Sequence, residues 1–135
     1  MEVKYNESTE LRPEGERLMD APLVTMDIPE FIKKIKKEPA WENKDRNAMT
    51  VYKTGGLRIV LIALHKNAEL KRHVAEGIIS VHVLEGKIEF TTDDASVELE
   101  EGQLLALHKG LYHQVKAIKE SVFLLTIANF TENKV

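Results

Sequence analysis

Histidines and carboxylates gather in and around the segment ELKRHVAEGIISVHVLEGKIEF, which covers residues 69–90. His73 and Glu76 stand in its polar first half, and His82 alternates with valines in its apolar second half. A further histidine, His113, stands at the start of the run YHQVKAI. Imidazole and carboxylate groups are the usual protein ligands of divalent metals, and histidine also acts as a general base near neutral pH. These residue types predict a metal site or an acid–base site, provided that the fold brings some of them together.

The elements that must position these residues are short strands. From about residue 48 onward, apolar and β-branched residues form short runs separated by turn signals such as TGG, EG and EEG. About eight such runs, with no strand–helix alternation, predict an all-β fold built as an antiparallel sandwich, jelly roll or barrel. The expected strands are AMTVYK, LRIVLIALH, IISVHVL, KIEFTT, SVELE, QLLAL, YHQVKAI and SVFLLTIAN.

A short helix is expected before the strands, in DIPEFIKKIKKEPAW. Asp27 and Glu30 have capping-box spacing, and apolar residues recur at i, i+3, i+4 and i+7. This amphipathic helix is expected to close at Pro39, after an aperiodic N-terminal arm. The sequence therefore predicts one domain, with the arm and helix over residues 1–47 and the β-barrel over residues 48–135.

Composition and charge argue against several classes of protein. The chain of 135 residues is 43% hydrophobic and 30% charged, as expected for a globular domain. Its formal charge of −3 gives no electrostatic footprint for nucleic acid, and the lack of cysteine removes disulfides and thiolate chemistry. The first twenty residues lack the apolar core of a signal peptide, and no apolar run reaches membrane-spanning length. A cytoplasmic protein with no membrane partner is expected.

The turn Glu85-Gly86 suggests a register for the strands on either side of it. If these residues form a two-residue hairpin turn, Val83 lies opposite Ile88 on an apolar face. His82 then points to the other side, opposite Glu89, and is expected to be an outward residue rather than a ligand. The inward set predicted from this parity is Val81, Val83, Ile88, Phe90, Val97 and Leu99.

His113 is expected to face inward. If Val115 in YHQVKAI faces the interior, so does His113, because side chains two residues apart in a strand share a face. An inward histidine at the start of a strand, near a barrel mouth, is placed for metal binding or proton transfer. A core histidine that is hydrogen-bonded to a backbone carbonyl remains an equally open alternative.

The stretch GQLLALHKGLYH, residues 102–113, resembles the second cupin motif, with His108 where proline is usual. VHVLEGKIEF is similar to the strand–turn–strand that ends the first cupin motif, with Gly86 as its final glycine. The resemblance covers residues 57 to about 129. It implies a small, single-domain jelly-roll β-barrel of the RmlC-like type, and cupins are often dimers.

The resemblance carries over only part of the metal site. Typical metal-binding cupins use three histidines and one glutamate. His113 matches the histidine of the second motif, and His73 fits the second member of the His-x-His pair. Lys71 takes the place of the first histidine, and Ile79 takes the place of the glutamate.

The resemblance thus implies His73 and His113 as metal ligands, with Glu76 from a bulged loop or His108 from a turn as further candidates. Two imidazoles completed by water or other side chains are expected to hold zinc, nickel, iron or manganese weakly. Lys71 would repel a cation and attract an anion. The position of Lys71, and that of Ile79 at the missing glutamate, are predicted as contacts of an organic ligand.

Two functions remain open after these observations. One is a binding or sensing module that holds a small polar or anionic molecule in the barrel. The other is a metal-dependent cupin enzyme of the dioxygenase or isomerase type. The missing histidine and glutamate favour the first. A homodimer is also expected, because the N-terminal segment has more apolar residues than its helix needs, namely Leu18, Met19, Leu23, Val24 and Met26.

Overall fold

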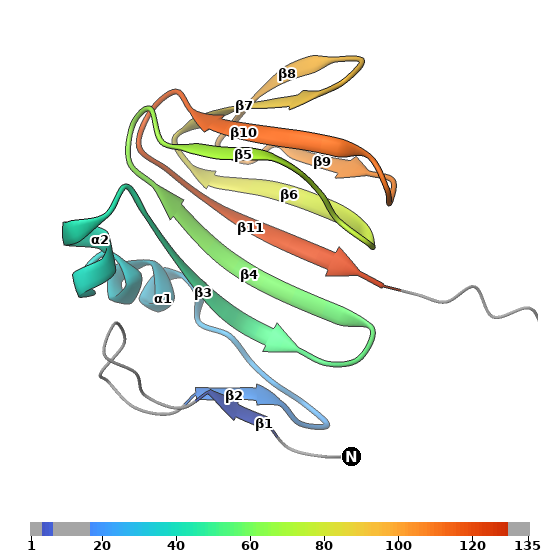
Figure 1. The fold of residues 1–135 in the computed structure, drawn as a ribbon. Helices are drawn as coiled ribbons and strands as arrows, with labels where there is room; N and C mark the ends of the chain where they lie inside the picture. The colour runs from blue at the N-terminus through green and yellow to red at the C-terminus, as the bar shows by residue number, and fades with distance from the viewer. Residues whose placement is uncertain (1–3, 7–16, 130–135) are drawn as a thin grey trace, which may run out of the picture.

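The computed structural model describes residues 4–6 and 17–129 and shows two facing antiparallel sheets, with two short helices on one side (Figure 1). The elements are β1 (Lys4–Asn6), β2 (Arg17–Asp20), α1 (Ile28–Ile35), α2 (Pro39–Asn43), β3 (Arg46–Lys53), β4 (Leu57–Leu64), β5 (Glu69–Val74), β6 (Ile78–Glu85), β7 (Lys87–Thr92), β8 (Ser96–Glu100), β9 (Leu104–Leu107), β10 (Tyr112–Ala117) and β11 (Ser121–Ala128).

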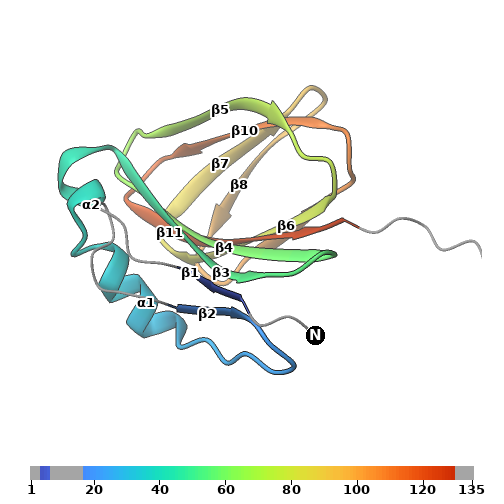
Figure 2. The same ribbon diagram turned by 60° about the horizontal axis from the view of Figure 1, so that its bottom comes forward.

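The two sheets enclose a barrel. The larger sheet has five strands in the order β3-β4-β11-β6-β9, and the smaller sheet has four in the order β5-β10-β7-β8. Every pairing within them is antiparallel. Figure 2 shows the smaller sheet lying over the larger one, with α1 and the β1–β2 hairpin on the outer side of the larger sheet. The predicted all-β jelly-roll barrel with a short N-terminal helix is confirmed.

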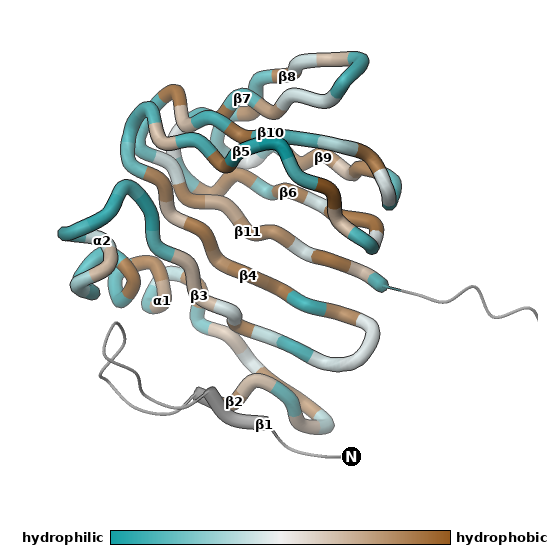
Figure 3. Tube along the Cα trace, viewed as in Figure 1, coloured by the Kyte–Doolittle hydropathy of each residue, from teal (hydrophilic) through white to brown (hydrophobic). Residues whose placement is uncertain are grey.

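The inner faces of the two sheets form the main core. Residues of alternating parity from both sheets meet there, and Phe123 and Val83 are almost completely buried. β4 and β11 are largely hydrophobic along their length (Figure 3), because the larger sheet is covered on both faces. Five of the predicted inward residues are buried, but Val97 on the edge strand β8 is 44% exposed, so its predicted burial is wrong.

The predicted hairpin at Glu85-Gly86 is also wrong. β6 pairs with β11 and β9, whereas β7 pairs with β10 and β8, so the chain passes from the larger to the smaller sheet at this turn. Gly86 has the positive φ expected of it, +84°. The apolar residues on either side are buried because the two sheets face each other. His82 points outward as predicted, but its cross-strand neighbours are Leu124 and Leu104.

The helices cover part of the outer face of the larger sheet. α1 begins where the sequence predicts, because the Asp27 side chain accepts a hydrogen bond from the Glu30 backbone N–H at 3.2 Å. Pro39 begins α2 instead of only ending the first helix. Trp41 in α2 is buried and stacks on His65, with ring centroids 3.5 Å apart. These contacts fix the helices on the sheet.

The described part of the N-terminal arm is more regular than predicted. Residues 4–6 and 17–20 pair as a small antiparallel sheet, although the sequence there has no strand pattern. Residues 1–3, 7–16 and 130–135 lie outside the described residues. Neither α1 nor α2 is long and apolar enough to cross a bilayer, within the ranges that the structure describes.

Candidate ligand site at the barrel mouth

His73 and His113 face each other across the pairing of β5 with β10. Their ring centroids are 4.2 Å apart and the rings meet edge to face. His113 is buried, as predicted, and stacks on Phe90 with centroids 5.4 Å apart. The pair lies at the end of the barrel where β5 ends and β10 begins, which we call the barrel mouth. The two histidines that sequence reasoning assigned to one site are therefore neighbours.

A β-bulge in β5 sets the orientation of His73. Leu70 lies opposite Val115, and the next pair along the two strands is His73 with His113, so β5 holds one extra residue between them. The bulge spans Lys71 and Arg72. Without it, Arg72 would lie opposite His113. Sequence analysis missed β5 altogether, because the bulge interrupts the alternation that identifies a strand.

Arg72 ties the bulge to the neighbouring elements. Its Nη2 donates hydrogen bonds to both carboxylate oxygens of Asp93, at 3.0 and 3.1 Å. Its guanidinium carbon also lies 3.8 Å from the centre of the Tyr112 ring. Asp93 follows β7, so Arg72 connects β5 across β10 to the turn between β7 and β8. These contacts hold the backbone that presents His73.

Both histidines have one ring nitrogen engaged by the backbone. Nδ1 of His73 lies 2.7 Å from the Lys71 carbonyl oxygen, and Nδ1 of His113 lies 3.1 Å from the Leu111 carbonyl oxygen. A carbonyl oxygen can only accept, so each Nδ1 carries the hydrogen. In the neutral imidazole, Nε2 then keeps its lone pair for a ligand's hydrogen-bond donor or a metal ion.

Burial lowers the pKa of His113 below its usual value. The hydrogen bond to the Leu111 carbonyl oxygen opposes this shift, and the neighbouring His73 adds to it. Removing a cationic imidazolium from water is costly in a mostly apolar environment, so the neutral form is favoured. His113 therefore keeps a neutral, accepting Nε2 at neutral pH.

The structure does not bring a third metal ligand to this pair. Glu76 lines two hollows, of about 260 and 320 Å³, and His108 lines the second of them, but neither His73 nor His113 is among the residues that line either hollow. Among the residues that the structure describes, no group of three or more His, Cys, Asp or Glu side chains is arranged to hold a metal. The two imidazoles supply two of the four protein ligands that a typical metal-binding cupin uses. The protein alone therefore does not complete the coordination shell of a metal ion.

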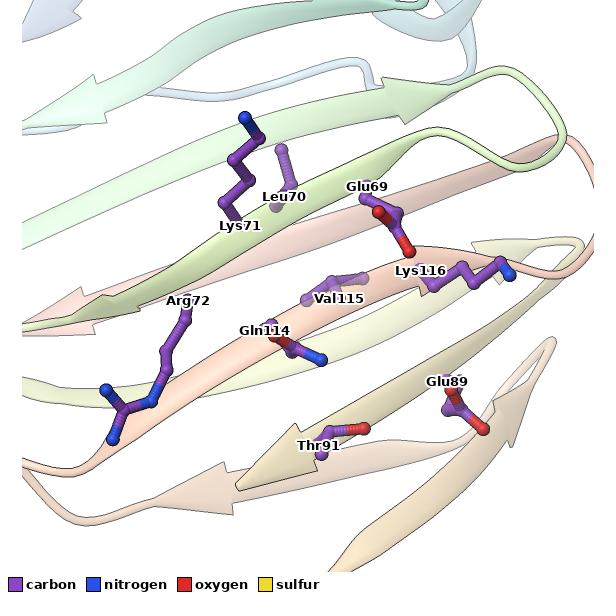
Figure 4. A pocket seen from close by; sticks show the side chains of 9 residues that line it. All are labelled: Glu69, Leu70, Lys71, Arg72, Glu89, Thr91, Gln114, Val115 and Lys116. Carbon is purple, nitrogen blue, oxygen red and sulfur yellow. The ribbon is translucent and has the colours of Figure 1, made fainter. Parts of the chain in front are cut away.

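The two predicted contacts of an organic ligand lie in different environments. Ile79 is 2% exposed and belongs to the main core, which leaves almost no surface for a ligand. Lys71 is exposed and lines a groove of about 120 Å³ together with strands of the smaller sheet. Figure 4 shows that Lys71 and Arg72 extend in different directions from β5. The other residues lining this groove are Glu69, Leu70, Glu89, Thr91, Gln114, Val115 and Lys116.

Arg58 is a further candidate for the site that the sequence analysis did not consider. It lies at the start of β4 opposite Ile127, whose side chain packs against the main core. Opposed residues in an antiparallel pair share a face, so Arg58 points to the inner side of the larger sheet. It lines a hollow of about 260 Å³ at the mouth, together with Ala75 and Asn129. No sequence signal identified it, because the apolar run of β4 that follows Arg58 is buried on both faces.

The structure resembles several solved structures, some of which are cupins. The protein-family model of the cupin domain matches residues 60–128 of the sequence. A conserved SPY1581 protein of unknown function from Streptococcus pyogenes is 27% identical over 64% of this chain and 75% of its own, with a TM-score of 0.61. An RmlC-like cupin from Desulfovibrio desulfuricans is 30% identical over 62% of this chain and 82% of its own, with a TM-score of 0.58.

KdgF from Halomonas sp. shares the fold at 16% identity, with a TM-score of 0.59 over 67% of this chain and 84% of its own. No curated protein matches the sequence. The cupin model spans about half of the chain and coincides with the barrel strands from β4 to β11. The chain belongs to the cupin family.

Proposed function

We propose that this cupin binds a small polar or anionic molecule at the barrel mouth, in contact with His73 and His113. One observation carries the proposal. The two imidazoles are adjacent on the inner face, and a backbone carbonyl engages Nδ1 of each, so both Nε2 atoms are available to a ligand. Backbone-held imidazoles are pre-organised, which lowers the entropic cost of binding.

The packing of the barrel supports a site at the mouth rather than deep inside. Apolar side chains from both sheets form the main core, and one of them, Phe90, stacks on His113. Arg58 places a cationic group in a hollow at the same end of the barrel, whereas Lys71 lines the groove on the outer face of the smaller sheet. A ligand with anionic or hydrogen-bonding groups is therefore favoured over an apolar one.

Ligand screening with histidine readout tests this proposal. Small organic acids, phosphates and sugars would be screened by thermal shift, and each hit would be titrated while the imidazole resonances are followed by NMR. We expect a ligand to shift the signals of His73 and His113 and to leave those of His82 unchanged. His73→Ala and His113→Ala should each weaken binding by about tenfold or more, and His82→Ala should not. Equal affinity in the His73→Ala, His113→Ala double variant would disprove the site.

A weakly held divalent metal is the second candidate, favoured by the two adjacent Nε2 lone pairs. Zinc, nickel, iron and manganese all accept imidazole ligands, and solvent or a bound anion would have to complete the shell. We derive no metal chemistry from this incomplete donor set. A metal-dependent cupin enzyme of the dioxygenase or isomerase type, the alternative function, would require such an ion.

Metal content by mass spectrometry, after growth with each of the four metals in turn, tests this candidate. A bound ion should be lost in His73→Ala and in His113→Ala and retained in His82→Ala. Its occupancy should fall below about pH 6.5, because protonated imidazoles cannot bind a metal. An ion that is retained in the double variant would be bound elsewhere.

A further inference from the structure

We infer that Arg58 anchors an oxyanion at the barrel mouth, so that the ligand carries a carboxylate or phosphate group. This inference rests on the proposed function and specifies the ligand's chemistry. Four observations support it: the face of β4 on which Arg58 lies, the hollow that it lines, the charges around that hollow and the geometry of the guanidinium group.

The register of β4 directs Arg58 toward the mouth. Val60, Ile62 and Leu64 alternate along β4 and contribute to the main core. Arg58 lies two residues before Val60, so it is the next member of this series toward the mouth. It is exposed, so its head group reaches solvent at the rim rather than being buried among apolar side chains.

The hollow that Arg58 lines is close to the histidine pair along the chain. Ala75 and Ile127, which both pack against the main core, form its apolar part. Ala75 follows His73 by two residues, which corresponds to about 7 Å of extended backbone. The hollow and the histidine pair therefore adjoin the same end of β5, and the inference requires a ligand that reaches from one to the other.

The charges around the hollow favour an anion. Lys53 lies opposite Arg58 in the β3–β4 pairing, so two cations occupy adjacent positions. Within the described ranges, neither cation forms an ion pair with an acidic side chain. Glu76 is the one acid among the residues that line this hollow, and it reduces the local positive charge.

The guanidinium group selects the kind of anion. Its planar fork of N–H donors matches the paired oxygens of a carboxylate or phosphate, whereas a lysine ammonium lacks this directionality. The groove on the outer face of the smaller sheet also has cations, including Lys116 (Figure 4). Glu69 and Glu89 lie directly opposite Lys116 in the neighbouring strands and offset its charge. Lys71 and Arg72 also line that groove, and Arg72 is paired with Asp93, so the mouth is preferred for its position beside the end of β5 that carries His73 rather than for its charge.

The experiment uses succinate and inorganic phosphate as probes, titrated by NMR and calorimetry into the full chain and its variants. The two probes distinguish a carboxylate ligand from a phosphate ligand. Arg58→Gln should weaken binding of the preferred probe by roughly 10- to 100-fold, the usual range for a lost charge-assisted hydrogen bond. Glu76→Gln should strengthen it. Lys116→Gln removes the same charge from the outer groove and should leave the affinity within about twofold.

The outcomes separate this inference from the proposed function. If a probe shifts the imidazole signals but Arg58→Gln binds it as the parent does, Arg58 is not the anchor and the proposed site stands. If Arg58→Gln weakens binding while the imidazole signals never move, the anchor stands and the proposed site fails. Equal losses in Arg58→Gln and Lys116→Gln, or no binding of either probe at tens of millimolar, overturn the inference.

Discussion

Leu70 and His73 share the inner face of β5 although they are three residues apart, a spacing that would put them on opposite faces of a regular strand. Leu70 packs against the main core and His73 meets His113, because the bulge at Lys71 and Arg72 shifts the alternation by one residue. The histidine pair at the mouth therefore depends on a local irregularity as well as on the strand pairing. Perturbing the bulge should affect the site before it affects the fold.

Arg72→Ala should loosen the bulge with a small loss of global stability. The Asp93 pair and the Tyr112 contact are exposed, so their combined contribution is about 1 kcal/mol or less. Local order should fall more, because the side-chain contacts that tie the bulge to Tyr112 and to Asp93 in the β7–β8 turn are lost. We expect faster amide hydrogen exchange in β5 and altered His73 signals. Lys66→Ala, in the loop before β5, serves as the control, and equal exchange in both variants would contradict the role of Arg72.

Folding stability should depend on the protonation of His113. Its pKa is lowered in the folded state, so the unfolded chain binds the proton more strongly. This contribution to stability is complete above about pH 6.5, the unfolded value, and is lost as pH falls toward the folded value. Thermal melts between about pH 7 and 5 should show a smaller acid-induced decrease in Tm for His113→Gln than for the parent. His82→Gln should behave like the parent.

Val81→Asp should abolish cooperative unfolding. Val81 is 1% exposed and lies between the two sheets, so an aspartate there would be a buried and unpaired charge. Val97→Asp makes the same chemical change at a position that is 44% exposed and should cost little. Urea unfolding followed by circular dichroism compares the two variants. Similar midpoints would mean that the inner face has been assigned incorrectly.

Gly86→Ala should destabilise the turn where the chain changes sheets. A β-carbon at Gly86 would overlap the carbonyl oxygen of Glu120 and lie 2.8 Å from the Ser121 Cα. Gly102 has a similar φ, +86°, but open space around it. Gly102→Ala should cost about 1–2 kcal/mol from backbone conformation alone. Gly86→Ala should cost about 1–3 kcal/mol more from crowding, measured by urea unfolding. Equal losses would exclude the crowding effect.

We propose that the chain forms a homodimer in which the N-terminal segment packs across a partner barrel. Leu23 in that segment is 80% exposed, and Leu104 on the outer face of the larger sheet is 62% exposed. Apolar side chains of this size are stabilised by burial in an interface. Light scattering at micromolar concentration should give twice the chain mass of 15.4 kDa. Leu23→Lys should shift the protein toward the monomer, and a monomeric parent would rule the proposal out.

The positions of most barrel strands and their face parity were predictable from the sequence, but β5 and the strand partners were not. Val83 and Ile88 have the parity of a hairpin pair, and they also have the parity of residues that face each other from two sheets. Hydrophobic patterning reports only which side is buried, so it cannot separate these arrangements. The pairings of β6 and β7 depend on strands that are distant in sequence.

Only those residues of the candidate site that lie in regularly alternating strands could be placed from the sequence pattern. His113 lies in a strand of regular alternation, so its inward direction followed from Val115. His73 follows a bulge, and the family resemblance rather than periodicity associated it with His113. Arg58 precedes an apolar run with both faces buried, where no polar alternation reveals which way a side chain points. Glu76 and His108 lie in loops, whose conformation sequence patterns do not encode.

β11 is the last strand of the described chain, yet it lies between β4 and β6 in the middle of the larger sheet. During synthesis, the edges of β4 and β6 that pair with β11 therefore remain unpaired until β11 has left the ribosome. Partly synthesised chains gain little stability, because the central pairing of β4 with β11 joins segments from opposite ends of the domain. Such a topology favours slow, all-or-none folding and exposes apolar strand edges to aggregation in the nascent chain.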